Sequence, residues 1–262
     1  MTAVSVSPLV TGRVRDKRDT RGVRRYVFDR WCADTLPVRA FLIQHPAGLC
    51  LFDAGQTAQA TTRGWFPWWH PFFRLSRFEL EPEDEAAPQL RSRGIGPEQV
   101  RRVLLSHLHT DHVGGLDAFP HAEVLVPRAE WKRANGLAGR IRGYLPQHWP
   151  PEIVPMLVDF DGRPFGPFAA SYDVAGDERL LLVPTPGHTP GHAALLVRAE
   201  EETWLLAGDM VHTAAELERV DAEVAAWCRE NRVTVLAAHD PEPPRPASTE
   251  AVSRGGTIEP WA

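Results

Sequence analysis

Four apolar runs in this 262-residue chain are each followed within a few residues by a histidine or an aspartate and then by a turn. The runs are VRRVLLSH, RLLLVPTPGH, TWLLAGD and VTVLAAHD, which carry His107, His188, Asp209 and His239. Apolar runs of this length, bounded by turn residues, are typical of buried strands. If all four strands end at the same edge of the sheets, polar groups from distant parts of the sequence gather in one place. The pattern therefore favours a fold in which these strand ends meet.

The segment SHLHTDHVGG adds three more groups of the same kind: His109, Asp111 and His112. Near the end of a strand alternate side chains point the same way, so we expect His107 and His109 to converge on one ion. The following turn would aim Asp111 and His112 at a second position. Imidazoles and carboxylates packed this closely are costly to bury unless a cation holds them. Surface histidines are the alternative, but HxHxDH after an apolar strand favours a metal site.

The rest of the pattern predicts an α/β chain. We expect strands at 24–29, 38–45, 49–55, 100–107, 122–127, 179–188, 192–199, 203–209 and 233–240, and helices at 83–92, 127–136 and 214–231. Prolines, glycine and aromatic residues predict irregular structure from 56 to about 82 and from 140 to 166. This order favours two packed β-sheets flanked by helices, in a single domain over 1–262 with an irregular tail from about 241.

Composition excludes several classes of protein. A formal charge of −5 gives no basic footprint for nucleic acid, which also argues against a nuclease. No run is long and apolar enough to span a bilayer, and the first residues lack the pattern of a signal peptide, so we expect a cytoplasmic protein without a membrane partner. Three scattered cysteines without CxxC indicate neither a disulfide framework nor a thiolate zinc site.

These motifs resemble the metallo-β-lactamase superfamily, in HxHxDH, GH at His188, GD at Asp209, AH at His239 and LFDAG around Asp53. The resemblance covers about 38–240 and implies an αββα sandwich of two mixed sheets. It implies two ligand sets and a bridge: His107, His109 and His188 for one metal, Asp111, His112 and His239 for the other, and Asp209 between them. Asp53 would be structural or support a ligand. We interpret His192, in the same TPGHTPGH segment, as a turn or supporting residue.

Two divalent cations about 3.5–4 Å apart can share a water and leave a hydroxide ready to attack an electrophilic carbon or phosphorus. The expected activity is therefore hydrolysis, with Asp111 passing a proton to the leaving oxygen. Histidine-rich sites favour zinc, while iron, manganese or cobalt also suits the mixed histidine and carboxylate ligands. A β-lactamase proper is disfavoured because Asp209 stands where those enzymes tend to have cysteine.

Within the superfamily, PVRAFLIQHPAGLCLFDAG is most similar to the N-acyl homoserine lactone hydrolases. That resemblance implies lactone ring opening, on a substrate with an apolar tail. Such enzymes commonly have tyrosine three residues after the bridging aspartate, whereas this chain has His212, which could donate the same hydrogen bond to the substrate or be an exposed loop residue.

GDMVH also resembles the organophosphate-hydrolysing branch, so phosphotriesters and aryl esters stay open as substrates. A glyoxalase-type thioesterase would need a helical region after His239, where we interpret the sequence as a tail. A non-catalytic metal-binding protein is the alternative of another class, and no ligand is missing that would favour it.

The segment WFPWWHPFF, 65–73, has six aromatic residues in nine. Its length and the lack of flanking basic clusters argue against a membrane-binding loop. Core packing is one interpretation, because tryptophan and phenylalanine bury large areas. The other is a pocket wall, since the resemblance places this region along the acyl-chain channel and also allows a homodimer contact. Four residues would then line the apolar tail: Trp65, Phe66, Trp68 and Trp69.

Overall fold

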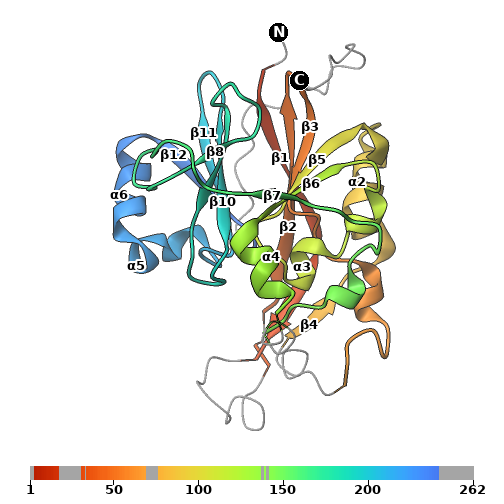
Figure 1. Ribbon diagram of the computed structural model, residues 1–262. Helices are drawn as coiled ribbons and strands as arrows, with labels where there is room; N and C mark the ends of the chain where they lie inside the picture. The colour runs from red at the N-terminus through yellow and green to blue at the C-terminus, as the bar shows by residue number, and fades with distance from the viewer. Residues whose placement is uncertain are drawn as a thin grey trace.

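The computed structural model describes residues 3–17, 31–32, 34–68, 76–136, 139 and 142–241. Two mixed β-sheets stand face to face in it (Figure 1). The seven-stranded sheet has the order β4-β1-β2-β3-β5-β6-β7 and the five-stranded sheet the order β12-β11-β10-β9-β8. The strands are β1 Ser5–Asp16, β2 Leu36–His45, β3 Gly48–Phe52, β4 Ser76–Glu79, β5 Val100–Leu104, β6 Glu123–Pro127, β7 Met156–Val158, β8 Tyr172–Asp173, β9 Leu180–Pro184, β10 Ala193–Arg198, β11 Thr203–Gly208 and β12 Val233–Ala237.

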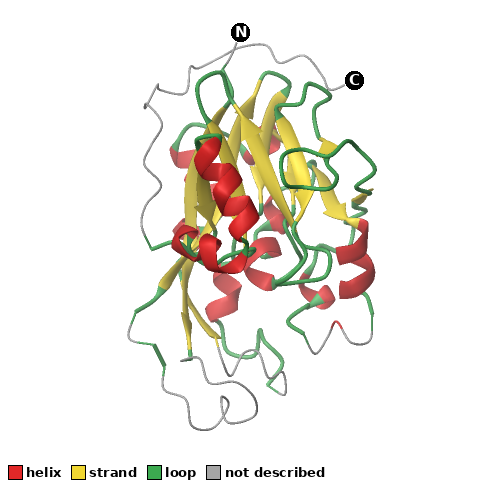
Figure 2. Ribbon diagram, turned by 90° about the vertical axis from the view of Figure 1, so that its left-hand side faces the viewer, coloured by secondary structure: helices red, strands yellow, loops and turns green. Residues whose placement is uncertain are grey.

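Helices cover the outer face of each sheet (Figures 1 and 2). The α-helices are α2 Ala86–Ser92, α3 Thr110–Val113, α4 Arg128–Ala134, α5 Leu217–Val220 and α6 Ala222–Glu230. Short 3-10 turns lie at η1 Ala58–Thr61, η3 Pro82–Asp84, η4 Pro97–Gln99, η5 Leu116–Ala118, η7 Pro146–His148 and η8 Ala214–Glu216. Helices α2, α3 and α4 lie beside the larger sheet and α5 and α6 beside the smaller one, which confirms the predicted αββα sandwich. No helix of the described residues has the length and apolar character needed to cross a membrane.

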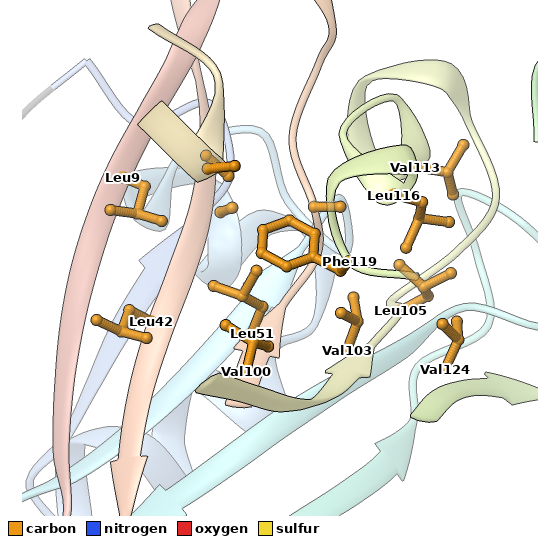
Figure 3. Close-up of a cluster of buried hydrophobic side chains, with 14 of the residues drawn as sticks. Leu9, Leu42, Leu51, Val100, Val103, Leu105, Val113, Leu116, Phe119 and Val124 are labelled. Atoms are coloured by element: carbon orange, nitrogen blue, oxygen red, sulfur yellow. The ribbon is translucent and has the colours of Figure 1, made fainter. Parts of the chain in front are cut away.

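The sequence of strand β2 is an almost unbroken apolar run because both faces of the strand are buried. Successive side chains of a strand point to opposite faces, and both faces of this sheet are covered. Ala40 and Leu42 therefore enter the core beneath the helices, whereas Phe41 and Ile43 enter the core between the sheets. Figure 3 shows Leu42 in the first of these cores, together with side chains from neighbouring strands and from the α3–η5 segment.

The smaller sheet follows the same alternation. In β10, Leu195 and Val197 pack between the sheets, and Ala194 and Leu196 pack under α5 and α6. Both faces of β10 are thus buried in apolar surroundings, which explains a strand without a single charge before Arg198. The two sheets are held together by this shared apolar layer.

The strand pairings bring the candidate ligands to one edge. β3 and β5 run parallel, as do β11 and β12, and β9 and β11 share one direction because each is antiparallel to β10. Parallel strands have their carboxyl ends at the same edge, where α/β proteins commonly bind ligands. The segments that follow these strands carry Asp53, the HxHxDH motif, His188, Asp209 and His239.

Several sequence-based boundaries were wrong. Strands expected to run to 107 and 188 end at Leu104 and Pro184, so the histidines lie on loops beyond them. The region 56–82, expected to be irregular, contains η1 and β4, and 140–166 contains η7 and β7. The expected helix 214–231 is broken at Asp221, whose carboxylate caps α6 by accepting the Val224 N–H. The long strand β1 was not expected, and the strand expected at 24–29 lies outside the described residues.

Candidate metal centre

All seven candidate ligands lie together. Their donor atoms form three overlapping groups in which the atoms lie within 4.8 Å of one another: His107, His109 and His188; His107, His112 and Asp209; Asp111, His112 and His239. Six of the seven are buried, and His188 is the exposed member, with a quarter of its side chain accessible. The first and third groups are the two ligand sets that the resemblance implied.

Asp209 lies between those two sets. Its Oδ2 is 3.3 Å from His188 Nε2 and 3.9 Å from His107 Nε2. Its Oδ1 is 3.3 Å from both His112 Nε2 and His239 Nε2. The two oxygens of one carboxylate are therefore divided between the two sets, as a bridge between two cations requires.

Two histidines share a buried hydrogen-bond network based on Asp53. The His107 Nδ1 is 3.0 Å from the Ser106 hydroxyl, which donates to Asp53 Oδ2 at 2.9 Å. The same Oδ2 is 2.8 Å from His112 Nδ1, and Oδ1 accepts the Ser106 N–H at 2.8 Å. Asp53 has a φ of 60°, a left-handed conformation that is rare outside glycine and that directs its carboxylate into this network. Both Nε2 atoms are thereby left facing the centre.

Two other histidines are oriented by backbone carbonyls. His109 Nε2 lies 3.0 Å from Arg142 O, and His239 Nδ1 lies 2.8 Å from Pro37 O. The opposite ring nitrogen of His109 faces His188 Nε2 at 3.0 Å, and that of His239 faces Asp209 and Asp111. Metal-binding histidines usually donate their other ring N–H to a carboxylate or a carbonyl in this way, because this fixes the tautomer.

The atoms at the centre fit a cation. His107 Nε2, His112 Nε2 and Asp209 Oδ1 are buried and have no hydrogen-bond partner among the described residues. A buried polar atom without a hydrogen-bond partner is costly, and three such atoms within 4.8 Å of one another are explained if cations bind beside them. Imidazole nitrogens and carboxylate oxygens are suitable ligands for zinc and other divalent transition metals.

The electrostatics of the two sets differ. Burial lowers the pKa of His109 to about 4 and that of His107 well below its usual value, and neighbouring imidazoles add to the effect. Burial also disfavours charge on His239, but the carboxylates of Asp209 and Asp111 outweigh it and raise its pKa to about 9. The pKa of His112 is raised well above its usual value for the same reason, because the carboxylates of Asp209, Asp53 and Asp111 outweigh the effect of burial. The set built from neutral histidines is thus ready for a cation, whereas the other must release protons to bind one.

His192 supports Asp209 from behind. Its Nε2 accepts the Asp209 backbone N–H at 3.1 Å, and its Nδ1 is 2.8 Å from the Thr185 hydroxyl. Burial lowers its pKa to about 3, which keeps the ring neutral and able to accept. The preceding Gly208 has a φ of 52°, and a Cβ there would lie 2.9 Å from His192 Nε2, so only glycine allows this approach.

His107 and His109 converge for a different reason from the one expected. They do not alternate along a strand, because β5 ends at Leu104. Instead His109 is the residue just before α3, and the turn of that helix places Asp111 and His112 beside it. Asp111 Oδ2 lies 3.6 Å from His239 Nε2 and 4.0 Å from His112 Nε2.

His212 lies at the edge of the ligand cluster, with half of its side chain exposed. Its ring centroid is 5.8 Å from that of His239 and 6.3 Å from that of His188. Its backbone N–H donates to Glu216 Oε2 at 3.1 Å, and its Nδ1 is 3.9 Å from the same oxygen. The structure therefore places His212 beside the candidate ligands.

The aromatic segment divides into two parts. Trp65 and Phe66 pack against a small apolar cluster that includes Val38, and Trp65 stacks on His148 with ring centroids 4.1 Å apart. Trp68 is 83% exposed. Trp69 lies outside the described residues, as do the remaining members of the aromatic run to 73.

Sequence reasoning missed the groups that hold the ligands in place, among them Ser106, Thr185 and Glu130. Glu130 is fully buried and accepts hydrogen bonds from both histidine-bearing loops. One signal was available: Glu130 and the buried Ala134 are four residues apart on α4, so a glutamate occupies the face that packs inward.

Comparison with known proteins identifies the family. Residues 33–254 match the metallo-beta-lactamase superfamily. The chain belongs to this superfamily. N-acyl homoserine lactonase AttM of Agrobacterium fabrum is 30% identical over 234 residues, which cover 79% of this chain and 83% of that protein. AttM of Azorhizobium caulinodans is 34% identical over 179 residues, which cover 65% and 63%.

Solved structures share the fold. B. thuringiensis AiiA with N-decanoyl-L-homoserine bound at the active site superposes with a TM-score of 0.72 and 22% identity, over 92% of this chain and 95% of that chain. An N-acyl homoserine lactone hydrolase with the product N-hexanoyl-L-homoserine at its catalytic metal center gives a TM-score of 0.70 and 22% identity, over 91% and 93%. This superfamily member is thus related to lactonases and has their architecture.

Proposed function

We propose that this protein is a hydrolase with two metal positions that opens the ester ring of N-acyl homoserine lactones or related lactones. The observation that carries the proposal is the Asp209 carboxylate, whose oxygens are divided between two sets of ligand atoms. The relatives named N-acyl homoserine lactonase support the substrate class. In this proposal His107, His109 and His188 hold one cation and Asp111, His112 and His239 hold the other.

Two divalent cations, zinc by preference, would supply a water activated at neutral pH and a positive charge to polarise the ester carbonyl. The chain's own contribution begins with orientation. Asp53, Arg142 O and Pro37 O hold the ligand imidazoles, so little reorganisation is needed when the substrate reacts.

Asp111 has a second role in the proposal. Ring opening joins the oxygen of water to the carbonyl carbon and breaks the ring carbon–oxygen bond, so the leaving alkoxide has to take up a proton. Asp111 Oδ2 is the carboxylate oxygen nearest His239 after Asp209, and its side chain is 10% exposed, so it can both bind a cation and exchange a proton with a substrate.

His212 is proposed to contact the substrate. Glu216 lies on the Nδ1 side of the ring, which leaves Nε2 to donate a hydrogen bond to the lactone carbonyl. A hydrogen bond that strengthens as charge develops on that oxygen lowers the barrier to attack. The aromatic segment would bind the apolar tail, with Trp65 and Phe66 fixed by packing and Trp68 accessible.

The test is a panel of N-acyl homoserine lactones, other lactones, aryl esters and phosphotriesters, assayed with protein loaded separately with zinc, iron, manganese and cobalt. We expect the highest kcat/KM on lactones. Activity on phosphotriesters alone would overturn the lactonase assignment and leave the metal centre in place. Full loading with two metals and no hydrolysis of any substrate would favour a non-catalytic metal-binding protein.

A further inference from the structure

Glu130 is a buried carboxylate that the proposed chemistry does not use. It lies in the first turn of α4 with no exposed surface. Its Oε1 accepts the backbone N–H of Leu108 at 3.1 Å. Its Oε2 accepts the Thr189 hydroxyl at 2.8 Å and the Gly191 N–H at 3.2 Å. A buried charge of this kind is retained only if its hydrogen bonds are made.

The three donors come from the two loops that carry one ligand set. Leu108 stands between His107 and His109, and Thr189 directly follows His188. One carboxylate therefore ties together the loop after β5 and the loop after β9, which are about 80 residues apart in the sequence. In the other ligand set, Pro37 O holds His239 and Asp53 holds His112, and Asp53 also supports His107 through Ser106.

The packing around Glu130 is close. A Cβ on Gly191 would lie 2.1 Å from the Glu130 backbone nitrogen, so the loop after β9 rests directly on the first turn of α4. Tyr144, whose side chain interacts with Glu130, pairs with His109 through the backbone, and the Tyr144 and His109 ring centroids are 5.1 Å apart. The loop after β9 is thus packed against the backbone of the residue whose carboxylate accepts its hydrogen bonds.

We propose that Glu130 is a positioning residue that sets the spacing of His107, His109 and His188 for a cation. The proposal rests on the metal centre of the proposed function and is independent of the substrate. It makes Glu130 specific for one of the two ligand sets. Groups that orient metal ligands typically change metal affinity by about 10–100-fold when they are replaced.

Glu130→Gln is the sharpest substitution. Glutamine has the same size but offers one oxygen and one NH₂ group. Whichever way the amide is turned, its NH₂ faces a backbone N–H, of Leu108 or of Gly191, and that buried donor loses its acceptor. Glu123→Gln is the matched control, because Glu123 is 43% exposed and its ion pair with Arg102 lies at the surface.

The experiment is a zinc titration of metal-free protein against a chromophoric chelator, which yields the dissociation constant of each binding step. His188→Ala identifies the step that belongs to the three-histidine set, because it removes one ligand of that set alone. We expect Glu130→Gln to raise the dissociation constant of that same step by about 10–100-fold and to change the other step far less. Glu123→Gln should match the wild type.

Thr189 provides a second test if Glu130→Gln does not fold. Thr189→Val removes the hydroxyl and keeps the shape, whereas Thr189→Ser keeps the hydroxyl. The valine variant should weaken the same zinc step and the serine variant should restore it. Equal weakening of both zinc-binding steps would overturn the positioning role, and so would unchanged zinc binding in Glu130→Gln and Thr189→Val. In either case, a wild type that binds two zinc ions would leave the proposed function in place. A wild type that binds no zinc would overturn both.

Discussion

At the scale of single residues, the centre is organised by the hydrogen bonds that four of its histidines make with their outer ring nitrogens. His107 is held by the Ser106 hydroxyl and His112 by Asp53. His109 and His239 are held by the backbone carbonyls of Arg142 and Pro37. The other nitrogen of each ring faces inward. Three buried atoms at the centre, in His107, His112 and Asp209, have no hydrogen-bond partner among the described residues. This combination is typical of ligands that are held in position for a cation.

Asp209→Asn tests the bridge. The amide keeps the shape but removes the negative charge and turns one bridging oxygen into an NH₂ group, which cannot bind a cation. We expect loss of activity beyond the roughly 100-fold that supporting residues cost, with fewer metal ions per chain. Measurement of kcat and metal content on the same sample decides the outcome. Full turnover with two metals bound to the variant contradicts the bridging role.

His212 can be tested by a pair of substitutions. His212→Ala removes the proposed donor to the lactone carbonyl, and loss of one such donor typically costs about 10²–10³-fold in kcat. His212→Tyr should retain much of the activity, because a phenol hydroxyl can donate to the same oxygen. Steady-state kinetics on one lactone compares the three proteins. An alanine variant with wild-type kcat identifies His212 as an exposed loop residue.

At the scale of elements, the long apolar strands and the clustered histidines were predictable and the irregular connections were not. The alternating burial of β2 and β10 follows from apolar runs covered on both faces. Strand β1 was hidden because Pro8 and Gly12 interrupt its pattern, and its register shifts between Val10 and Arg13. Strand β4 lies next to the aromatic segment, where the prolines suggested irregular structure. The local pattern therefore failed where pairing with a neighbouring strand decides the conformation.

The ligand set could be predicted because its residues belong to sequence motifs, whereas the groups that support the ligands could not be predicted. Glu130, Arg142 O and Pro37 O contact histidines or their loops from positions up to about 200 residues away in the sequence. Carbonyl groups are present at every residue, so no sequence pattern marks the two that are used. The break between α5 and α6 was missed for a related reason, since the capping role of Asp221 depends on its backbone conformation.

Trp68 tests the aromatic segment. Because its side chain is 83% exposed, Trp68→Ala should leave the fold intact, whereas Trp65 is stacked on His148 and would be a less specific probe. If Trp68 covers the acyl tail, its loss should raise KM more for long-chain than for short-chain lactones, since each buried methylene contributes about 0.8 kcal/mol. The short-chain substrates serve as the internal control. Equal changes in KM at all chain lengths would show that Trp68 does not contact the acyl tail.

At the scale of the whole molecule, the buried histidines link stability to pH in opposite directions. His109 and His192 have pKa values lowered to about 4 and about 3, so the unfolded chain binds protons near pH 6.5 that the folded chain does not. Their contribution is present above pH 6.5 and is lost as the pH falls towards 4. His239 is raised to about 9, so its contribution is present below pH 6.5 and is lost as the pH rises through 9.

The metal-free protein should therefore be most stable near pH 6.5. Each histidine contributes a slope of about 1.4 kcal/mol per pH unit within its own window. Urea unfolding of chelator-treated protein between pH 5 and 9 measures the profile. Zinc should abolish the decline above pH 6.5, because cation binding strengthens as its ligands lose protons. A free energy of unfolding that is flat, or that rises from pH 6.5 to 5, contradicts the assigned protonation states.

Metal-dependent activity is the decisive test of the proposal that one site with two metal positions hydrolyses lactones. Metal-free protein is titrated with zinc while the bound metal and the rate of ring opening of an N-acyl homoserine lactone are measured on the same samples. We expect no activity without metal, and activity that returns as binding approaches two ions per chain. Ring opening by the metal-free protein, or saturation without any lactone hydrolysis, would contradict it.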